Sequence, residues 1–591
     1  MNTLNAKSAR PLITDWCQID WQKINQYVEK LQQRIYHAES VGNKRKVRDL
    51  QRMLMNSEAA LLVSIRRVTQ LNHGKRTAGV DGYKALNPQD RLKLFMEMRD
   101  MKLSLHTPKP AYRTYIRKRN GKLRPLGIPT IRDRVYQNVV RLALEPQWEA
   151  RFEPISYGFR PKRNCHDAIE RIFNTMKSNN NKKQWIFEGD FKGCFDTLSH
   201  EYILKQIQGF PEAELIMKWL RAGYVDNNVF NETREGTPQG GIISPLLANI
   251  ALHGMESTLG IEYKLVRHGD MITYENHTPY TVCRYADDFV IMCETKKEAE
   301  DLYLVLKDYL SDRGLTLSDE KTRITHIMEG FDFLGFNVRK YQTHTGTKLL
   351  VKPSKNSIRS FEAKITEIVQ GSYGNNVQVL ISRLNPVIIG TANYWCRTVA
   401  KETFSAMDNY IWQRVYHYLR RSHPKKSWKW IKKQYFKPDK TGQSKNQWIL
   451  TDPDTGNQLK KMSWTPIIRH AQIKYNYSPF NVELKDYFER RDRKEFDLNN
   501  VAYRQKLAKK QKYVCPLCGM SITNFEEGLE THHKQPKVQG GSNDYKNLQL
   551  VHISCHIEYH REYPAKGEVP TQAQISQYCK RMKAKRLAGI L

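Results

Sequence analysis

Long hydrophobic runs are absent from this 591-residue sequence. None of its apolar stretches approaches the roughly 18 uncharged residues that a membrane-spanning helix requires, which excludes a membrane protein of that class. The first residues, MNTLNAKSARPLITDW, also lack the apolar centre of a secretory signal peptide. Cysteine is scarce, with ten in the chain, and most are scattered in the manner of buried, reduced thiols. The sequence therefore predicts a cytoplasmic protein that folds without a disulfide framework.

Acidic residues are too few to balance the basic ones. The chain has 96 lysine and arginine residues against 61 aspartate and glutamate residues, which gives a net charge of +35. An excess of this size is typical of proteins that bind a polyanion, most often nucleic acid. The length allows about three to five domains of ordinary size, so one chain can combine several functions.

The spacing of apolar residues divides the chain into helical and mixed segments. Residues 18–70 show helical periodicity with lysine and arginine on the other faces, which fits either a solvated helical hairpin or a basic RNA-binding extension. Residues 115–129 predict a β-hairpin with a two-residue turn at Asn120 and Gly121. Short apolar strands alternate with helical stretches over 131–345, as in a mixed α/β domain.

Aromatic and basic residues interleave in HPKKSWKWIKKQYF at 423–436. Aromatic faces can stack on bases while lysines contact phosphates, as in proteins that bind single strands. An amphipathic helix whose lysine stems lie along the protein surface explains the same pattern, so both interpretations stay open.

Two apolar segments end in aspartates that could share metal ions. CRYADDFVIM at 283–292 predicts a hairpin with Asp287 and Asp288 at its tip, and WIFEGDFKGCFD at 185–196 predicts a strand that ends in Asp190. Nucleotidyl transfer uses two Mg²⁺ ions about 3.5–4 Å apart, one on the attacking 3′-hydroxyl and one on the triphosphate. Mg²⁺ prefers hard oxygen ligands. An isolated Asp-Asp pair is usually a solvated turn, but together with a third strand-end carboxylate it predicts a metal-dependent polymerase.

The segments around these aspartates resemble the reverse transcriptase–maturases encoded within group II introns. The similar segments occur in the order expected for that family: AGVDG at 78–82, KLRPLGIPTIRDRVYQ at 122–137, SYGFRPKRNCHDAI at 156–169, EGDFKGCFDTLSH at 188–200, GTPQGGIISPLLANIALH at 236–253, RYADDFVI at 284–291, LSDEKTRITH at 317–326, FDFLGF at 331–336 and NPVIIGTANYW at 385–395. The resemblance implies a right-hand polymerase with fingers, palm and a helical thumb. It also implies that Asp190, Asp287 and Asp288 bind catalytic Mg²⁺.

The same resemblance assigns further residues to the incoming nucleotide. Phe195 would crowd the 2′ position of the sugar, although an ordinary core phenylalanine is the alternative. Arg117 and Arg124, on the predicted hairpin, could hold the triphosphate as a charged fork. Gln239 lies in TPQGG, whose glycines permit close approach of the backbone to a nucleotide, and Lys321 could protonate the leaving pyrophosphate. A plain turn at Gln239 and solvated positions for the three basic residues are the competing explanations.

Cysteine and histidine gather in one segment near residue 515 and beyond. Cys515 and Cys518 form a pair with two intervening residues, and His552 and Cys555 form a second such pair. Two short pairs of this kind are typical of a tetrahedral structural Zn²⁺ site. A redox-active Cys-x-x-Cys motif is the alternative, which the second pair disfavours.

The remaining histidines of this segment resemble the HNH, or ββα-metal, endonuclease motif. The resemblance implies that His532, His556 and His560 bind one divalent metal, with the last two on one face of a helix. His533 would be the general base that activates water, and Asn547 would orient it. Imidazole ligands accept several metals, so the identity of this ion stays open.

We therefore predict a multidomain α+β protein. Its expected parts are an N-terminal helical basic extension (1–75), reverse transcriptase fingers and palm (76–350), a thumb or maturase domain (351–422), a DNA-binding region (423–505) and a C-terminal ββα-metal nuclease with structural zinc (506–591).

The resemblance implies a ribonucleoprotein cycle. The protein would bind its group II intron RNA, assist splicing, nick target DNA with the HNH domain, and copy the RNA from the freed 3′-hydroxyl with deoxynucleoside triphosphates. Such a complex would work in the bacterial cytoplasm at the nucleoid, without a membrane partner. Two alternatives remain: an RNA-binding maturase that acts only in splicing, and a reverse transcriptase of another element such as a defence system.

Overall fold

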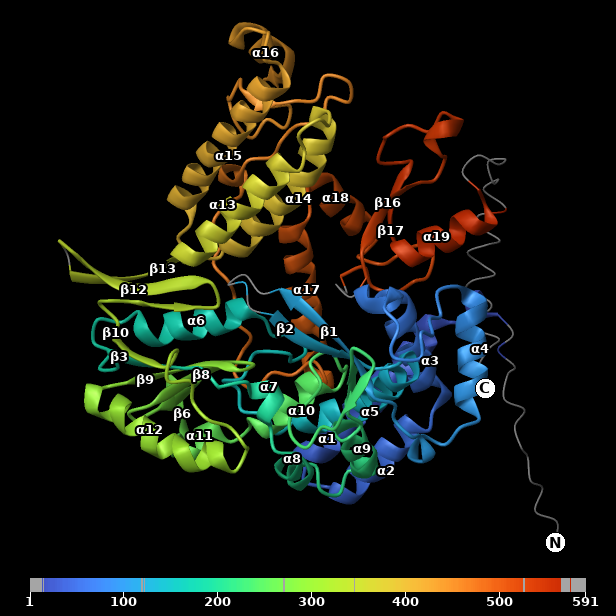
Figure 1. Cartoon of the computed structure of the whole chain (residues 1–591), viewed down its shortest axis with the longest axis vertical. Coiled ribbons are helices and arrows are strands. Elements are labelled where there is room, and N and C mark those ends of the chain that lie inside the picture. Colours follow the sequence, from blue (N-terminus) through green and yellow to red (C-terminus); the bar gives the residue numbers. More distant parts are fainter. Residues whose placement is uncertain are drawn as a thin grey trace.

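Figure 1 presents the computed structural model of the chain, which describes residues 13, 15–117, 121, 123–268, 271–344, 346–523, 527–564 and 574. An N-terminal helical part and two β-sheets form the base, a helical arm rises from it, and a small ββα unit follows at the C-terminal side (Figure 1). Among the described residues, no helix has both the length and the apolar character needed to cross a membrane.

The N-terminal residues form a helical layer around one long helix. The layer consists of α1 (Trp21–Ser40), α2 (Lys44–Met55), α3 (Glu58–Arg66) and α4 (Pro88–Arg99), and the long helix is α5 (Ile131–Glu149). Asp20 caps α1 by accepting hydrogen bonds from the backbone N–H groups of Gln22 and Lys23. The apolar residues of these helices share one hydrophobic core with residues as distant as Leu315. The N-terminal helices are therefore part of the main core and not a detached, solvated hairpin.

The first sheet, which we call the fingers sheet, has the strand order β2-β1-β4-β5. Its strands are β1 (Ala111–Arg117), β2 (Leu123–Ile128), β4 (Tyr224–Asp226) and β5 (Val229–Asn231). The antiparallel pairing of β1 with β2 confirms the predicted hairpin. Arg117 pairs with Leu123, which leaves an odd number of residues between them, so the predicted two-residue turn is wrong. Asn120 lies outside the described residues, and Gly121 has a φ of 81° that glycine adopts without strain.

The second sheet, the palm sheet, has the order β10-β3-β9-β8. Its strands are β3 (Trp185–Gly189), β8 (Thr281–Tyr285), β9 (Asp288–Cys293) and β10 (Arg323–His326). Helix α6 (Cys165–Met176) covers one face and α12 (Lys296–Ser311) covers the other (Figure 1). Val290 belongs to the core on the α6 side, whereas Phe289 and Ile291 belong to the core on the α12 side. Because both faces are buried, β9 reads as a continuous apolar run.

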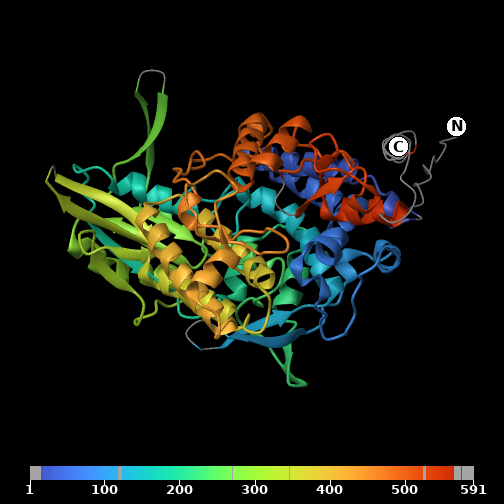
Figure 2. The ribbon, with the colours of Figure 1, turned by 90° about the horizontal axis from the view of Figure 1, so that it is seen from above.

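Shorter elements connect the two sheets. They are α7 (Cys194–Thr197), α8 (His200–Gln206), α9 (Ala213–Leu220), α10 (Ser244–Ala251), α11 (Met255–Thr258), β6 (Tyr263–His268) and β7 (Met271–Asn276). Single turns of 3₁₀ or π helix lie at η1 (Trp16–Gln18), η2 (Arg67–Leu71), η3 (His73–Arg76), η4 (Leu103–Leu105), η5 (Met462–Trp464), η6 (Val482–Leu484) and η7 (Lys537–Gln539). Figure 2 shows the β6–β7 hairpin standing away from the body of the molecule.

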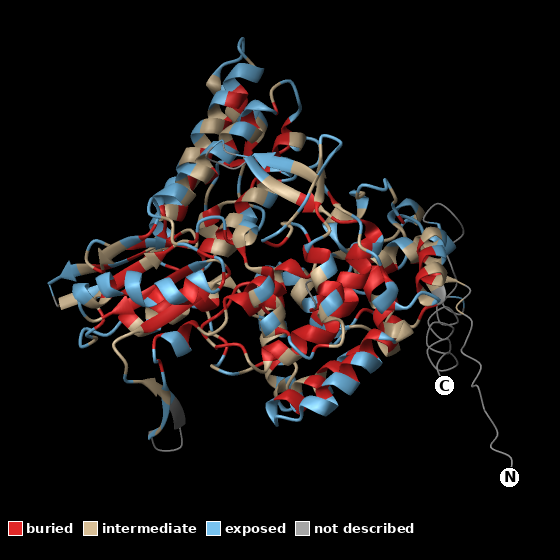
Figure 3. Ribbon diagram, turned by 60° about the horizontal axis from the view of Figure 1, so that its bottom comes forward, coloured by how far each residue is buried: buried red, intermediate tan, exposed pale blue. Residues whose placement is uncertain are grey.

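A third sheet leads into the helical arm. Its strands are β11 (Phe331–Phe333), β12 (Phe336–Thr343) and β13 (Gly346–Pro353), and the arm consists of α13 (Lys355–Gln370), α14 (Val377–Trp395), α15 (Lys401–Ser422), α16 (Trp428–Tyr435), β14 (Phe436–Lys437) and β15 (Ile449–Leu450). This part shares a second hydrophobic core with α6. Exposed residues line much of the arm, whereas buried residues fill the base (Figure 3). Helices α13, α14 and α15 lie within residues 351–422, the range in which a helical thumb is expected.

The chain then returns across the base to a small C-terminal unit. Its elements are α17 (Lys485–Asn499), α18 (Ala502–Lys510), β16 (Leu529–His533), β17 (Leu548–His552) and α19 (Ile553–Glu562), around a third hydrophobic core. The unit packs on the N-terminal helices, where the buried guanidinium of Arg66 lies 3.6 Å from Glu527. Asn25 and Met520 also touch there, although 495 positions separate them in sequence. Figure 2 shows the two chain regions side by side.

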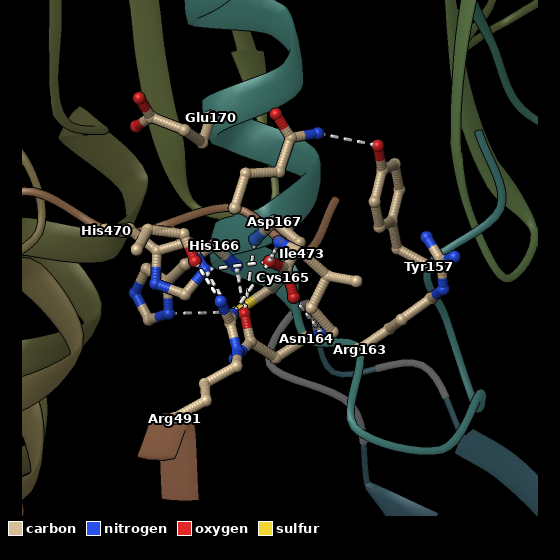
Figure 4. Close-up of polar contacts among 12 residues, drawn as sticks. Tyr157, Arg163, Asn164, Cys165, His166, Asp167, Glu170, His470, Ile473 and Arg491 are labelled. Atoms are coloured by element: carbon tan, nitrogen blue, oxygen red, sulfur yellow. Dashed lines mark hydrogen bonds and ion pairs between the residues drawn. The ribbon is translucent and has the colours of Figure 1, made fainter. Parts of the chain in front are cut away.

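A buried carboxylate fastens the segment after the arm to α6. Asp167 Oδ1 accepts hydrogen bonds from His470 Nε2 (2.9 Å), the backbone N–H of Ile473 (2.9 Å) and Arg491 Nη2 (3.0 Å) (Figure 4). Its other oxygen accepts from the backbone N–H of Asn164 and so completes a capping box at the start of α6. Burial alone would raise the pKa of Asp167, but the hydrogen bond from His470 and the charge of Arg491 lower it below its ordinary value.

Replacing Asp167 with asparagine should strongly destabilise the protein. The Arg491 side chain, which is 14% exposed, would lose its carboxylate partner. Removing one partner of a buried ion pair costs about 3–5 kcal/mol. Because the folded-state pKa of Asp167 is lowered, its contribution is present above the unfolded-state pKa of about 3.9 and is lost as the pH falls through the lower folded value. Urea unfolding at pH 7 and at successively lower pH measures both effects.

The matched control is Asp492→Asn, which breaks a more exposed ion pair with Lys162 between the same two parts of the molecule. Exposed pairs of this kind contribute about 1 kcal/mol or less. Equal losses of stability in the two variants would contradict the role given to Asp167.

Two candidate catalytic centres

The three predicted metal-binding aspartates meet at one end of the palm sheet. Strands β8 and β9 form a hairpin with Ala286 and Asp287 as its two central residues, and Asp288 begins β9. Gly189 of β3 lies opposite Phe289 of β9, so Asp190, the next residue along, comes to the same end as Asp288. The register of β3 against β9 therefore brings the two aspartate segments together.

Close packing surrounds this turn. Ala286 has a φ of 58°, at the first central position of a two-residue turn where glycine is usual. A Cβ on Gly158 would lie 2.3 Å from the Ala286 nitrogen, and one on Gly189 would lie 2.0 Å from the ring of Phe289. Backbone held in a sparsely populated conformation persists only where its surroundings determine it. The turn that carries Asp287 is thus a strained feature supported by its neighbours.

Like charges crowd the aspartate site. Burial and the like charges of Asp287 and Asp190 raise the pKa of Asp288 to about 6. Lys321 Nζ lies 2.9 Å and 3.0 Å from the two carboxylate oxygens of Asp190 and offsets part of the repulsion. Carboxylate oxygens are the donors that Mg²⁺ prefers, but among the described residues these three do not all lie within 4.8 Å of one another, so a shared Mg²⁺ would have to draw them together.

Two of the predicted nucleotide-binding residues lie on adjoining segments, Phe195 on α7 and Gln239 on the loop before α10. The Thr237 backbone N–H donates to the Phe195 carbonyl (2.6 Å), and Gln239 Nε2 lies 3.5 Å from the Asp196 carboxylate. Phe195 is half-buried and packs edge-on against Phe159, with 6.5 Å between ring centroids. The sequence analysis missed Phe159, although it lies within the SYGFRP segment. The Gln239 carbonyl also accepts from Gly127 of β2, which ties this loop to the fingers sheet.

The two predicted arginines of the fingers sheet lie on opposite faces. Arg117 pairs with Leu123 and Arg124 pairs with Ile116. Residues directly opposite each other share a face and successive residues alternate, so Arg117 and Arg124 point to different sides. A two-residue turn would have set the two arginines opposite each other. The structure therefore does not bring them together as one charged fork.

The predicted zinc ligands form one cluster. The ligand atoms of Cys515, Cys518, His552 and Cys555 all lie within 4.8 Å of one another. Cys518 Sγ is 3.3 Å from His552 Nδ1, while His552 Nε2 lies 3.2 Å from the Ser521 carbonyl. Donation by Nε2–H to that carbonyl leaves Nδ1 free as a metal ligand. Three sulfur donors and one imidazole, largely buried, fit a structural Zn²⁺.

The three predicted nuclease ligands form a second cluster beside it. The ligand atoms of His532, on β16, and of His556 and His560, on α19, lie within 4.8 Å of one another. Burial and the like charges of His556 and His560 lower the pKa of His532 to about 3. Its buried Nδ1 has no hydrogen-bond partner among the described residues. A neutral His532 with an unsatisfied buried nitrogen, close to two further imidazoles, fits a divalent metal.

The partners of His533 differ from the predicted ones. His533 Nε2 lies 2.9 Å from Asn543 Oδ1, whereas no hydrogen bond joins it to Asn547 within the described part of the chain. The Asn547 side chain instead donates to the carbonyls of Gln535 (3.1 Å) and Ser542 (2.8 Å) and accepts from the Gln535 N–H. Asn547 thus closes the loop that follows β16, and Asn543 is the residue that contacts His533. The sequence offered two asparagines in this loop and no local signal to choose between them.

Glu530 is a further residue that the sequence analysis missed. Its carboxylate is hydrogen-bonded to Nδ1 of His556, which leaves Nε2 of His556 toward the cluster. Glu530 and His532 are two positions apart on β16 and therefore share its α19-facing side, which is the signal that could have revealed it. A carboxylate on the outer nitrogen of a ligating histidine orients the ring and raises its basicity.

The change Glu530→Gln should weaken metal binding at this cluster. Loss of such a carboxylate typically reduces metal affinity by about 10–100-fold. The metal concentration that gives half-maximal nicking of a labelled DNA duplex should rise by that factor, while saturating metal restores the rate. Glu489→Gln, which removes an exposed carboxylate of α17, is the control and should leave this concentration unchanged. A drop in rate that no metal concentration restores would argue against the assignment.

Comparison with known proteins places four family models along the chain. They describe the N-terminal domain of reverse transcriptase (residues 16–98), reverse transcriptase, or RNA-dependent DNA polymerase (116–338), the group II intron maturase-specific domain (358–436) and the HNH endonuclease (515–562).

Curated relatives also match the chain. Protein YkfC of Escherichia coli (strain K12) is 35% identical over 348 residues, which are 54% of this chain and 91% of that protein. The group II intron-encoded protein LtrA of Lactococcus lactis subsp. cremoris is 33% identical over 365 residues, 49% of this chain and 59% of LtrA. Maturase-like protein 1 of Euglena gracilis is 27% identical over 412 residues, 67% of this chain and 83% of that protein.

Proposed function

Since the chain belongs to the family of group II intron-encoded reverse transcriptases with a maturase-specific domain and an HNH endonuclease domain, we propose that it carries out target-primed reverse transcription of its own intron RNA. The nuclease centre nicks one strand of a DNA target, and the polymerase centre extends the freed 3′-hydroxyl with deoxynucleotides on the RNA template. The observation that carries this proposal is the presence, in one chain, of the crowded aspartate site and a separate histidine cluster. The maturase-specific segment supports a role in binding and splicing the intron.

In the polymerase, Asp190, Asp287 and Asp288 hold Mg²⁺. Bound there, Mg²⁺ lowers the pKa of the primer 3′-hydroxyl and neutralises the triphosphate. Lys321, already paired with Asp190 at the rim of the site, is suited to give a proton to the leaving pyrophosphate. A bond to that leaving group requires the Lys321 ammonium to move away from Asp190.

The remaining residues of this centre select the nucleotide. The half-buried Phe195 ring forms a wall at the sugar, and Gln239 backs the nucleotide from the adjoining loop. Of the two arginines of the fingers sheet, we assign the triphosphate to Arg124, because it lies on β2, the strand that is hydrogen-bonded to the Gln239 loop. Arg117, on the opposite face, is available to the template strand.

In the nuclease, His532, His556 and His560 hold one divalent metal, which activates the scissile phosphate as a Lewis acid. His533 accepts the proton of the attacking water, and Asn543 orients its ring. Asn547 acts indirectly, by holding the loop that contains Asn543. Zn²⁺ at Cys515, Cys518, His552 and Cys555 stabilises the fold of this unit.

Nucleic acid would also contact the outer end of the helical arm, at α16 (Figure 1). Trp430 and Trp448 are 38% and 39% exposed, with Lys426 Nζ 5.3 Å from the first ring and Lys432 Nζ 3.8 Å from the second. Such cation-backed rings can stack on bases, which supports a DNA-binding role for residues 423–505. We propose that residues 1–75 form the basic N-terminal extension, 76–350 the fingers and palm, 351–422 the thumb and 506–591 the nuclease. The protein would act on DNA in the bacterial cytoplasm as a ribonucleoprotein with its intron RNA.

The proposal is tested by a reaction of the protein with its intron RNA, a labelled DNA duplex that carries the intron insertion site, and deoxynucleotides. We expect a nick and complementary DNA joined to the nicked strand. Complementary DNA that begins elsewhere, with the target intact, would support the alternative of a reverse transcriptase for another element. Splicing without DNA synthesis would support a maturase alone.

The change Asp287→Ala should abolish DNA synthesis and spare RNA binding. A metal ligand contributes several kcal/mol of transition-state stabilisation, so single-nucleotide incorporation should fall by roughly 10³-fold or more. Asp301→Ala removes an exposed carboxylate of α12 and is the control for lost charge. Filter binding of the intron RNA measures affinity in parallel. An equal loss of RNA affinity in the Asp287 variant would mean that the change acts through folding.

The two metal clusters of the C-terminal unit should be separable. Cys515→Ser removes a buried zinc ligand, so bound zinc should fall and the unit should become sensitive to protease. His533→Ala removes only the base, so the unit should stay folded while nicking falls by about 10²–10⁴-fold. Both variants should still extend a pre-annealed primer. Retained nicking in the His533 variant would refute the base assignment, and loss of primer extension in either would refute the independence of the two centres.

A further inference from the structure

A buried arginine lies directly behind the catalytic turn of the polymerase. The Arg284 side chain has no solvent exposure, and its Nη1 donates to the Ala286 carbonyl (3.1 Å) and to Asn249 Oδ1 (3.1 Å). That carbonyl belongs to the peptide unit that links Ala286 to Asp287. One guanidinium nitrogen therefore holds the backbone immediately before a metal-binding aspartate.

Asn249 carries this support to the other side of the turn. It is buried on α10, and its Nδ2 donates to the Gly158 carbonyl (2.8 Å) while its Oδ1 accepts from Arg284. Gly158 is the residue whose missing side chain lets its backbone pack against Ala286. The Asn249 amide therefore links Arg284 to Gly158, the two residues that contact Ala286 from either side.

Backbone pairing completes the enclosure. The Arg284 N–H donates to the Ile155 carbonyl (3.0 Å), and the Arg284 carbonyl accepts from the Tyr157 N–H (2.9 Å). The segment before Gly158 thus runs along the end of β8 like an additional strand.

Helix α10, which carries Asn249, also contacts the loop of Gln239. It begins at Ser244, whose hydroxyl donates to the Pro238 carbonyl in that loop (2.9 Å). One short helix therefore connects the nucleotide loop to the support of the catalytic turn.

The position is costly for a cation. Among the described residues no carboxylate lies within ion-pair distance of Arg284, and burial lowers its pKa below the ordinary value, although the charge of the nearby Glu153 acts in the opposite direction. A buried charge without an ion-pair partner costs folding free energy, which only its hydrogen bonds can offset. The buried Arg313 provides a comparison, since it also donates only to carbonyls, those of Ala251, His253 and Tyr309, but away from the turn.

We propose that Arg284 and Asn249 are positioning residues of the polymerase reaction, which together clamp the Ala286 turn so that Asp287 is held where it binds metal. This inference rests on the proposed function. The left-handed conformation costs about 1–2 kcal/mol for a residue other than glycine, so without the clamp the turn relaxes toward other conformations. A displacement of about 1 Å in a catalytic group can lower a rate by roughly 100-fold.

The test compares Arg284→Lys, Asn249→Ala and the control Arg313→Lys by single-nucleotide incorporation on an RNA template. Lysine keeps the charge of Arg284, but its side chain ends one bond short of the Nη1 position and lacks the rigid guanidinium plane, so it cannot hold both acceptors in the same geometry. We expect kcat to fall by roughly 100-fold in the first two variants, the KM for deoxynucleotide to change little, and the Mg²⁺ concentration for half-maximal rate to rise. Arg313→Lys should keep the wild-type kcat. The double variant should lose no more than either single one, because both act on one turn.

Folding is monitored by DNA nicking, which depends on the nuclease centre, and by the midpoint of thermal unfolding. If Arg284→Lys also loses nicking, Asn249→Ala, which keeps the cation, decides the question. A second readout is rescue by glycine. Adding Ala286→Gly to Arg284→Lys supplies the left-handed conformation without strain, so kcat should rise about tenfold above that of Arg284→Lys alone.

Equal losses of kcat and midpoint in the Arg284 and Arg313 variants, or a failure of glycine to rescue, would overturn the clamp. Absence of polymerase activity in the wild type would instead overturn the proposed function.

Discussion

The pairing of β3 with β9 is the constraint on which the rest of the molecule depends. Gly189 lies opposite Phe289, and this register sets Asp190 beside Asp287 and Asp288. Because side chains alternate along a strand, a slip by one residue would exchange the two buried faces of β9 and turn its apolar residues toward the wrong helices. The two hydrophobic cores on either side of the palm sheet therefore fix the same register that the carboxylates need.

Buried polar contacts then hold the outer parts against this centre. Asp167 fastens the segment after the helical arm to α6, and the Arg66–Glu527 pair fastens the C-terminal unit to the N-terminal helices. Arg66 also stacks on Trp21, with 4.6 Å from its guanidinium carbon to the ring centroid. Contacts of this kind have directional hydrogen bonds, so they fix the orientation of one part on another more closely than apolar contact does. The nuclease and polymerase centres are thereby kept in a defined relation although their cores are separate.

The two centres use different donor chemistry for reasons that their surroundings explain. At the palm sheet, three carboxylates repel one another, and a cation with a preference for hard oxygen would relieve the repulsion that Lys321 leaves. At the histidine cluster, burial lowers the pKa of His532, so this imidazole is neutral, as a metal ligand must be. Each centre is thus electrostatically prepared for its metal by the protein around it.

Local spacing carried much of what could be predicted. Cys515 and Cys518, or His556 and His560, are close in sequence, so one turn or one helical face brings their ligand atoms together in any fold that forms. The apolar runs around Asp287 and Asp190 likewise predicted strands that end in carboxylates, since β-branched and aromatic residues favour buried strands. These features depend on neighbours only a few positions away.

Tertiary structure alone decided the contacts between distant or equivalent residues. Arg117 and Arg124 fall on opposite faces because the hairpin register differs by one residue from that of a two-residue turn. Asn543 and not Asn547 contacts His533, because the side-chain amide of Asn547 is used in the hydrogen bonds that close the loop. The hydrogen bond of Arg284 to Asn249 and that of Arg491 to Asp167 join segments with no shared periodicity. The packing of the cores determines which of these residues meet, and the pattern of residues along the sequence does not specify that packing.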